Sequence, residues 1–152
     1  MLLQLIGTQL AKYLTKEHIY EDHYFRISID DIKSALEPGD VVLVEGQSRV
    51  SNAIQFITNS NWSHAAIFIG EAGSLSHCLI EVKAVDGCIF TDIDVYMHHN
   101  LRICRPMFLN NKKRKILIDY LIKKVGSKYD LKNIIDLIRY IFPNPPVPKK
   151  LR

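Results

Sequence analysis

Cysteine is scarce in this sequence. The 152 residues contain only three, Cys78, Cys88 and Cys104, and no two of them form a CxxC pair. An odd number without paired spacing argues against a disulfide framework and against a structural zinc site. Because free thiols persist in reducing compartments, we expect a cytoplasmic protein that needs neither a metal ion nor another cofactor.

Long apolar runs and a secretory leader are also lacking. No stretch approaches the ~20 apolar residues that a membrane-spanning helix needs. The first residues, MLLQLIGTQLAKYLTK, have no basic region ahead of their apolar residues and make a poor signal peptide. With 47% hydrophobic and 24% charged residues, the composition is that of an ordinary globular protein. A chain of this length predicts a single domain over residues 1–152.

Acidic residues are scarce at one end of the chain. Residues 110–152 contain twelve lysines and arginines but only three aspartates, a net charge of +9, whereas residues 1–109 carry −5. Such asymmetry can mark a surface for nucleic acid or anionic lipid. The simpler interpretation is two solvated basic helix faces, since no aromatic residues alternate with the cations as in single-strand binders. We therefore expect no nucleic-acid partner and keep peripheral membrane contact as an alternative.

Apolar periodicity predicts an α+β fold, a small antiparallel sheet flanked by helices. Strands are expected at 41–44, 64–70, 79–85, 88–90 and 101–105, with a turn over 70–76 and a hairpin turn at Asp86-Gly87. Helices are expected over 2–14, from 30 or 31 to 36, after Ser48, from 110 to 126 and over 130–142. The proline-rich residues 143–152 predict an extended segment.

His64 stands at the start of an apolar strand. The segment NWSHAAIFIG has the pattern of a buried strand, and a lone histidine there is most often a hydrogen-bonded structural residue. Glu81 interrupts the next apolar run in the same way. If the two strands pair, Glu81 comes close to His64, and its carboxylate can hold one ring nitrogen while the other accepts a proton. The alternative partners of Glu81 are Lys83 and Arg102.

Five segments, in order, resemble one protein family. They lie within residues 36–142 and read LEPGDVVLVEG, NWSHAAIFIG, LIEVKAVDGCIF, ICRP and VGSKYDLKNIIDLIRYIF. Together they are similar to the circularly permuted papain-like (NlpC-type) cysteine hydrolases, in particular the YiiX/YaeF-like branch. The resemblance implies a permuted papain-like fold and cleavage of an amide or ester acyl bond, in a peptidoglycan peptide, another amide or a lipid acyl group.

The resemblance also implies roles for individual residues. His64 corresponds to the family's general base, and Glu81 corresponds to the acid that orients it. Asp40 corresponds to a structural aspartate at the turn into the first strand. An aromatic or hydroxyl side chain near the base can line a substrate groove, although Trp62 and Tyr129 could equally pack on the sheet. The candidate substrate-binding residues are Trp62, Ser63 and Tyr129.

The family's nucleophilic cysteine has no counterpart in the sequence. In the permuted order it follows the tyrosine–aspartate segment, yet no cysteine follows Cys104. We expect the nucleophile either to lie beyond Arg152 or to be lost, so that this chain alone is inactive. Cys88 is the least unsuitable substitute, but all three cysteines are expected to be small buried hydrophobic residues.

Three functions remain open at this stage. The first is a thiol hydrolase scaffold with His64 as base and Glu81 as orienting acid. The second is a catalytically inactive binding protein that uses the same groove. The third is a basic adaptor for anionic membrane or nucleic acid, acting through the +9 segment. His98 and His99 are not expected to bind a metal, since adjacent histidines on a loop point apart.

Overall fold

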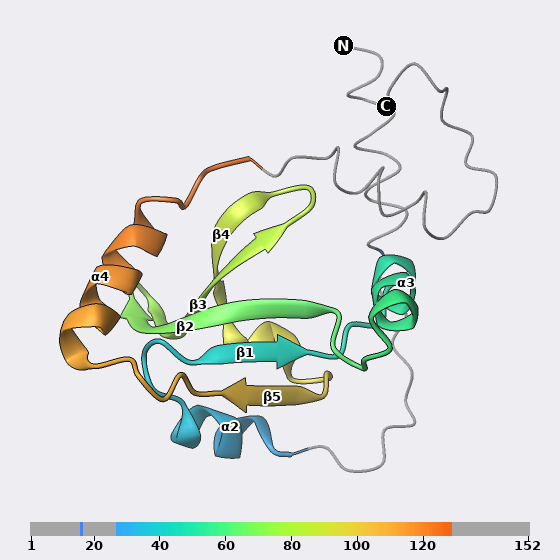
Figure 1. Cartoon of the computed structure of the whole chain (residues 1–152), viewed down its shortest axis with the longest axis horizontal. Coiled ribbons are helices and arrows are strands. Elements are labelled where there is room, and N and C mark those ends of the chain that lie inside the picture. The colour runs from blue at the N-terminus through green and yellow to red at the C-terminus, as the bar shows by residue number, and fades with distance from the viewer. Residues whose placement is uncertain (1–15, 17–26, 129–152) are drawn as a thin grey trace.

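The computed structural model describes residue 16 and residues 27–128 (Figure 1). The helices expected over 2–14 and 130–142, the extended segment 143–152 and Tyr129 lie outside the described residues. The described part contains α2 (Ile29–Ala35), β1 (Val41–Val44), α3 (Arg49–Thr58), β2 (His64–Ala72), β3 (Leu75–Lys83), β4 (Gly87–Asp92), η1 (Ile93–Tyr96), β5 (Leu101–Cys104) and α4 (Asn111–Ile122).

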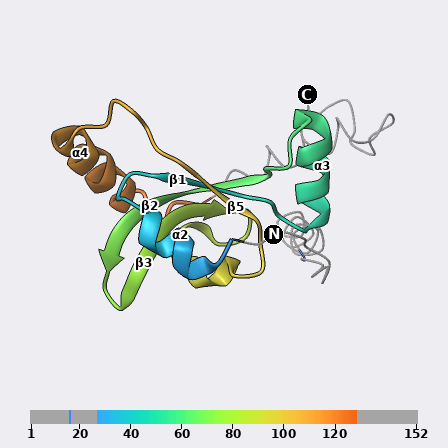
Figure 2. The same ribbon diagram turned by 90° about the horizontal axis from the view of Figure 1, so that it is seen from below.

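The strands form one antiparallel sheet, so the α+β prediction is confirmed. Its order is β4-β3-β2-β1-β5, which places β1 between β2 and β5. Figures 1 and 2 show α3 at one end of the sheet and α4 at the other. Within residues 27–128, no helix is both long and apolar enough to cross a bilayer.

The two faces of the sheet have separate apolar cores. One, called here the α2 face, packs against α2 and η1 through Val42, Val44, Ala66, Phe68, Leu79, Ile32, Ile93 and Tyr96. The other, the α4 face, packs against the end of α4 and the residues after it through Ile69, Cys78, Ile80, Cys88, Ile118, Leu121 and Val125. Because alternate residues of a strand point to opposite faces, β2 and β3 contribute to both cores.

Side-chain caps begin the helices where the sequence places them. The Ser48 hydroxyl accepts a hydrogen bond from the Ser51 amide at 3.1 Å, and the Asn110 carboxamide oxygen accepts one from the Lys113 amide at 2.9 Å. Each bond satisfies an amide that has no partner inside its helix. The helix expected to continue to Gly126 is shorter than predicted, since α4 ends at Ile122.

The turn expected over 70–76 is also shorter than predicted. β2 continues to Ala72 and β3 already begins at Leu75. Gly70 has a positive φ of 92°, and the register shifts on both sides of it. A bulge at a glycine lets the strand continue where an alternating pattern fails. His77 and Cys78, which precede the strand expected over 79–85, therefore lie inside β3.

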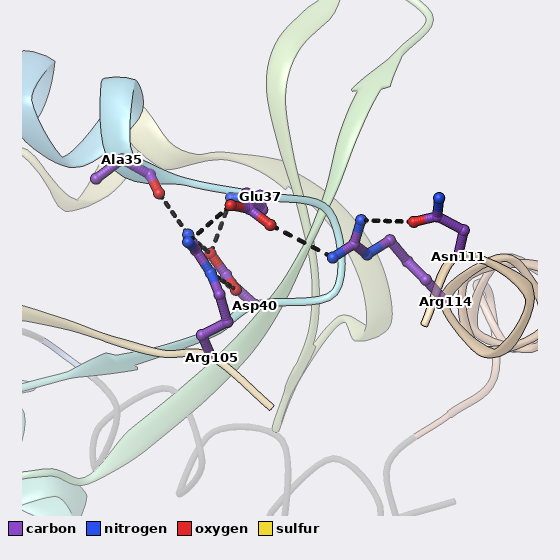
Figure 3. A network of polar contacts seen from close by, with 6 residues as sticks. All are labelled: Ala35, Glu37, Asp40, Arg105, Asn111 and Arg114. Atoms are coloured by element: carbon purple, nitrogen blue, oxygen red, sulfur yellow. Dashed lines mark hydrogen bonds and ion pairs between the residues drawn. The ribbon is translucent and has the colours of Figure 1, made fainter. Parts of the chain in front are cut away.

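Asp40, at the turn into β1, is the centre of a polar network (Figure 3). It is only 1% exposed and accepts two hydrogen bonds from the Arg105 guanidinium, at 2.9 and 2.8 Å. The same guanidinium donates to Glu37 at 2.7 Å and to the Ala35 carbonyl at 2.6 Å. Arg105 thereby ties the end of α2 and the start of β1 to the end of β5.

Candidate active site

The pairing of β2 with β3 brings His64 and Glu81 together. Ala66 lies directly opposite Glu81, and His64 lies directly opposite Val44. Directly paired residues share a face, so both side chains point to the α2 face. The Nε2 atom of His64 is 2.6 Å from Oε2 of Glu81. The proximity predicted from the strand pattern is thus present in the structure.

The carboxylate of Glu81 is buried, whereas the ring of His64 reaches solvent. The Glu81 side chain is 0% exposed and that of His64 is 28% exposed. Burial on its own raises the pKa of a carboxyl group. Here hydrogen bonds from His64, Thr91 and Tyr96, together with the charge of Lys83, outweigh burial and lower the pKa of Glu81 from 4.5 to about 2. Glu81 is therefore ionised at neutral pH.

The sequence analysis gave Lys83 and Arg102 as alternative partners of Glu81, and the structure distinguishes between them. The Lys83 ammonium lies 3.3 Å from Oε1 of Glu81, so this ion pair exists alongside the contact with His64. Arg102 lies on β5, opposite Leu43 of β1. This pairing places its side chain on the α4 face, and two strands, β1 and β2, lie between β5 and the strand of Glu81. The Arg102 alternative is therefore wrong.

Tyr96 is a part of the site that the sequence analysis missed. Its hydroxyl donates to Oε2 of Glu81 at 2.5 Å, the same oxygen that contacts His64. The Asp92 side chain accepts a hydrogen bond from the Asp94 amide at 3.0 Å and starts η1, which places Tyr96 over the sheet. The sequence offers Asp92 and Asp94 as possible caps of a short turn, but no local signal shows which side chain of that turn is buried.

Replacing Tyr96 with phenylalanine is expected to raise the pKa of Glu81. The carboxylate loses one of its donors, and a hydrogen bond to a charged group contributes about 1.5–3 kcal/mol, equivalent to about one pH unit or more. A ¹³C NMR titration of the Glu81 carboxyl carbon measures this shift. Tyr120→Phe, at an exposed position of α4, is the matched control. A titration that is the same in Tyr96→Phe and in the unsubstituted protein would contradict the expectation.

The candidate substrate-binding residues lie just before β2. The Ser63 hydroxyl accepts a hydrogen bond from the Gly46 amide at 3.0 Å, which joins this segment to the end of β1. A side chain at position 46 would collide with the hydroxyls of Ser51 and Ser63, at 2.3 and 2.8 Å from its Cβ. Trp62 is half-buried. The contacts of Ser63 show that it stabilises the segment before β2. Substrate binding by Trp62, Ser63 and Tyr129 stays a prediction.

The three cysteines lie on the face of the sheet opposite to His64. Cys78 is separated from Glu81 by an odd number of strand positions, Cys88 pairs with Val82, and Cys104 pairs with Val41. Each therefore belongs to the α4 face. Cys78 and Cys88 are buried as expected, whereas Cys104 is only half-buried. Burial raises the pKa of the Cys78 thiol, which makes it a poor nucleophile.

Comparison with known proteins gives a family match. The model of the permuted papain-like amidases of the YaeF/YiiX, C92 family matches residues 35–140, which include the whole sheet, the Asp40 network and the His64–Glu81 pair. A comparison with curated proteins gave no match. The matched span is well over half of the chain, and its described part has the α+β architecture that the resemblance implied. The chain therefore belongs to the YaeF/YiiX (C92) family of permuted papain-like amidases.

Proposed function

We propose that His64 is the general base of a thiol-dependent amidase site and that Glu81 orients it. The main observation in support of this proposal is the 2.6 Å contact between Nε2 of His64 and Oε2 of Glu81. A buried, ionised carboxylate fixes the ring and stabilises its protonated form. The reaction proposed is cleavage of an amide or ester acyl bond, in a peptidoglycan peptide, another amide or a lipid acyl group.

The contact with Glu81 determines which ring nitrogen is available. A carboxylate accepts hydrogen bonds, so the neutral ring carries its proton on Nε2 and keeps a lone pair on Nδ1. Nδ1 can take the proton of a thiol as its sulfur attacks the acyl carbon. The protonated ring then donates that proton to the leaving nitrogen or oxygen. In the second half of the cycle it activates the water that releases the acyl group.

The position of the cysteines restricts the nucleophile. Cys78, Cys88 and Cys104 lie on the α4 face, and the sheet separates them from His64. A thiol that reacts with Nδ1 must therefore come from outside these three residues. The same observation favours a second candidate, a binding protein in which His64 and Glu81 hold a ligand without breaking a bond.

Acyl 4-nitroanilides and 4-nitrophenyl esters, assayed with the full chain, separate these functions. Because the sequence has no thiol besides these three cysteines, the assay includes an added small thiol as the nucleophile. For the amidase we expect turnover that depends on this thiol, and we expect His64→Ala to lower its kcat/KM by about 10²–10⁴-fold, the usual contribution of a general base. Single cysteine-to-alanine variants at positions 78, 88 and 104 are expected to leave kcat/KM unchanged. Loss of turnover in one of them would place the nucleophile among these cysteines. Ligand binding that depends on His64 without turnover would support the binding protein instead.

A further inference from the structure

The loop between β5 and α4 presents two adjacent apolar side chains to solvent. Met107 is 86% exposed and Phe108 is 84% exposed. The next residue, Leu109, packs against the turn into β1, because a Cβ at Gly39 would lie 2.6 Å from its Cδ2 atom. The loop is also fixed at both ends, by the Asp40 network before it and by the N-cap of α4 after it. Met107 and Phe108 are therefore held outside the core.

The outer side of α4 exposes apolar side chains as well. Ile116 is 61% exposed and Tyr120 is 57% exposed. Residues four apart on a helix lie on the same side, so these two form a stripe along α4. Ile118 and Leu121 lie on the other side of the helix and pack on the α4-face core. The stripe therefore faces away from the sheet.

Basic residues surround these apolar side chains. Residues 107–128 contain seven lysines and arginines but only one acidic residue, Asp119, and their net charge is +6. Among the described residues, Arg114 is the one of these seven that forms an ion pair, with Glu37 at 3.4 Å. No acidic patch of the described chain therefore neutralises the helix. The exposed lysines of α4 and the turn after it are Lys112, Lys113, Lys115, Lys123 and Lys124.

A bilayer with anionic headgroups matches both properties of this surface. Lysines near such a bilayer are attracted to its negative surface potential, and exposed apolar side chains gain free energy when they enter the boundary between headgroups and acyl chains. The long apolar stems of lysine can lie along the same boundary while the ammonium groups stay in water. Nucleic acid would use the lysines through phosphate contacts and would leave Met107 and Phe108 exposed to water.

We propose that residues 105–110 and the outer side of α4 form a docking surface for an anionic phospholipid bilayer. Met107 and Phe108 enter the boundary region, and the stripe of Ile116 and Tyr120 lies on it. The lysines of α4 contact the phosphate groups of the lipids. The basic character of this end of the chain is thereby given a partner that the described fold itself does not supply.

The docking surface begins at the end of β1 that is farther from His64. Cys104, the last residue of β5, pairs with Val41, whereas His64 pairs with Val44. A bilayer that receives the loop after β5 can therefore hold the protein without covering the start of β2. The proposal does not depend on the proposed function.

Vesicle sedimentation with the full chain tests the electrostatic part of the proposal. The vesicles contain equal parts of phosphatidylcholine and phosphatidylglycerol, and vesicles of phosphatidylcholine alone are the reference. We expect binding to the anionic vesicles that weakens as sodium chloride is added. Lys113→Gln is expected to lower the partition coefficient about fivefold, the usual contribution of one lysine near an anionic surface. Lys33→Gln removes the same charge from α2, where Lys33 pairs with Asp94, and is expected to have little effect.

Phe108→Ser tests the apolar part. We expect the partition coefficient for the anionic vesicles to fall by about tenfold, because a large apolar side chain no longer leaves water. Phe108→Leu keeps an apolar side chain and is expected to retain most of the binding. Phe56→Ser is the matched control, since Phe56 of α3 is 87% exposed at the other end of the sheet, and it is expected to bind like the unsubstituted protein.

Four outcomes overturn the proposal. The first is no binding to the anionic vesicles, or equal binding to both compositions. The second is equal binding by Phe108→Ser and Phe56→Ser, and the third is an equal loss in Lys113→Gln and Lys33→Gln, which would show that only the net charge matters. The fourth is binding to a DNA duplex, in place of the vesicles, that Lys113→Gln weakens and Phe108→Ser does not. This last result would make the surface a site for nucleic acid.

Discussion

Replacing Glu81 with glutamine is expected to remove a large, pH-dependent part of the free energy of unfolding. The pKa of Glu81 is lowered from 4.5 to about 2 in the folded protein. A lowered pKa means that the folded state favours the ionised form, so the stabilisation is present above about pH 4.5 and is lost as the pH falls towards 2. The difference corresponds to about 3 kcal/mol.

Glutamine keeps the size of the side chain but cannot ionise. We therefore expect Glu81→Gln to be less stable by about 3 kcal/mol at pH 7, with the difference from the unsubstituted protein narrowing as the pH falls to 3. Urea unfolding at pH 7, 5 and 3 measures this. Glu71→Gln, an exposed position on the neighbouring strand β2, is the matched control. A difference that stays constant with pH would show that packing, rather than charge, stabilises the protein at position 81.

Features governed by local sequence could be predicted. The helix starts at Ser48 and Asn110, the apolar run of β1 and the hairpin at Asp86-Gly87 appear where their residues place them. The helix expected from Asp30 or Asp31 begins slightly earlier, at Ile29, because Ser28 caps it. The approach of His64 to Glu81 was predictable as well, because antiparallel neighbours bring the start of one strand beside the end of the next. These predictions needed one assumption only, that consecutive strands pair.

Features governed by register and distant contacts could not be predicted. The bulge at Gly70 shifts the β2–β3 pairing, and the turn residues proposed from composition became strand. The face of Cys88 depends on its pairing with Val82, and the burial of Tyr96 depends on how η1 packs. Neither follows from neighbouring residues.

Arg105→Ala is expected to lower the free energy of unfolding by about 3 kcal/mol. Removing one partner of a buried ion pair leaves the other charge without compensation, which costs about 3–5 kcal/mol. In this variant Asp40 would keep the hydrogen bond from the Glu37 amide, at 2.8 Å, but it would lose both hydrogen bonds from the guanidinium group. The lower end of the range applies because Arg105 itself is 44% exposed. Lysine at this position cannot form the paired bonds, so Arg105→Lys is expected to recover only a part of the loss.

The Asp40 network also predicts how the stability of Arg105→Ala depends on pH. Burial alone raises the pKa of Asp40, but the bonds from Arg105 and Glu37 lower it below its usual value. Without Arg105 the pKa is expected to rise, so the stability of Arg105→Ala should fall with decreasing pH earlier than that of the unsubstituted protein. Arg102→Ala, an exposed arginine on the same strand, is the control in urea unfolding. Equal losses in the two variants would mean that the Asp40 network does not stabilise the fold. A larger loss in Arg105→Ala would show that the Asp40 network holds β1 in place. Because β1 pairs with the strand that carries His64, the network would then also support the position of His64.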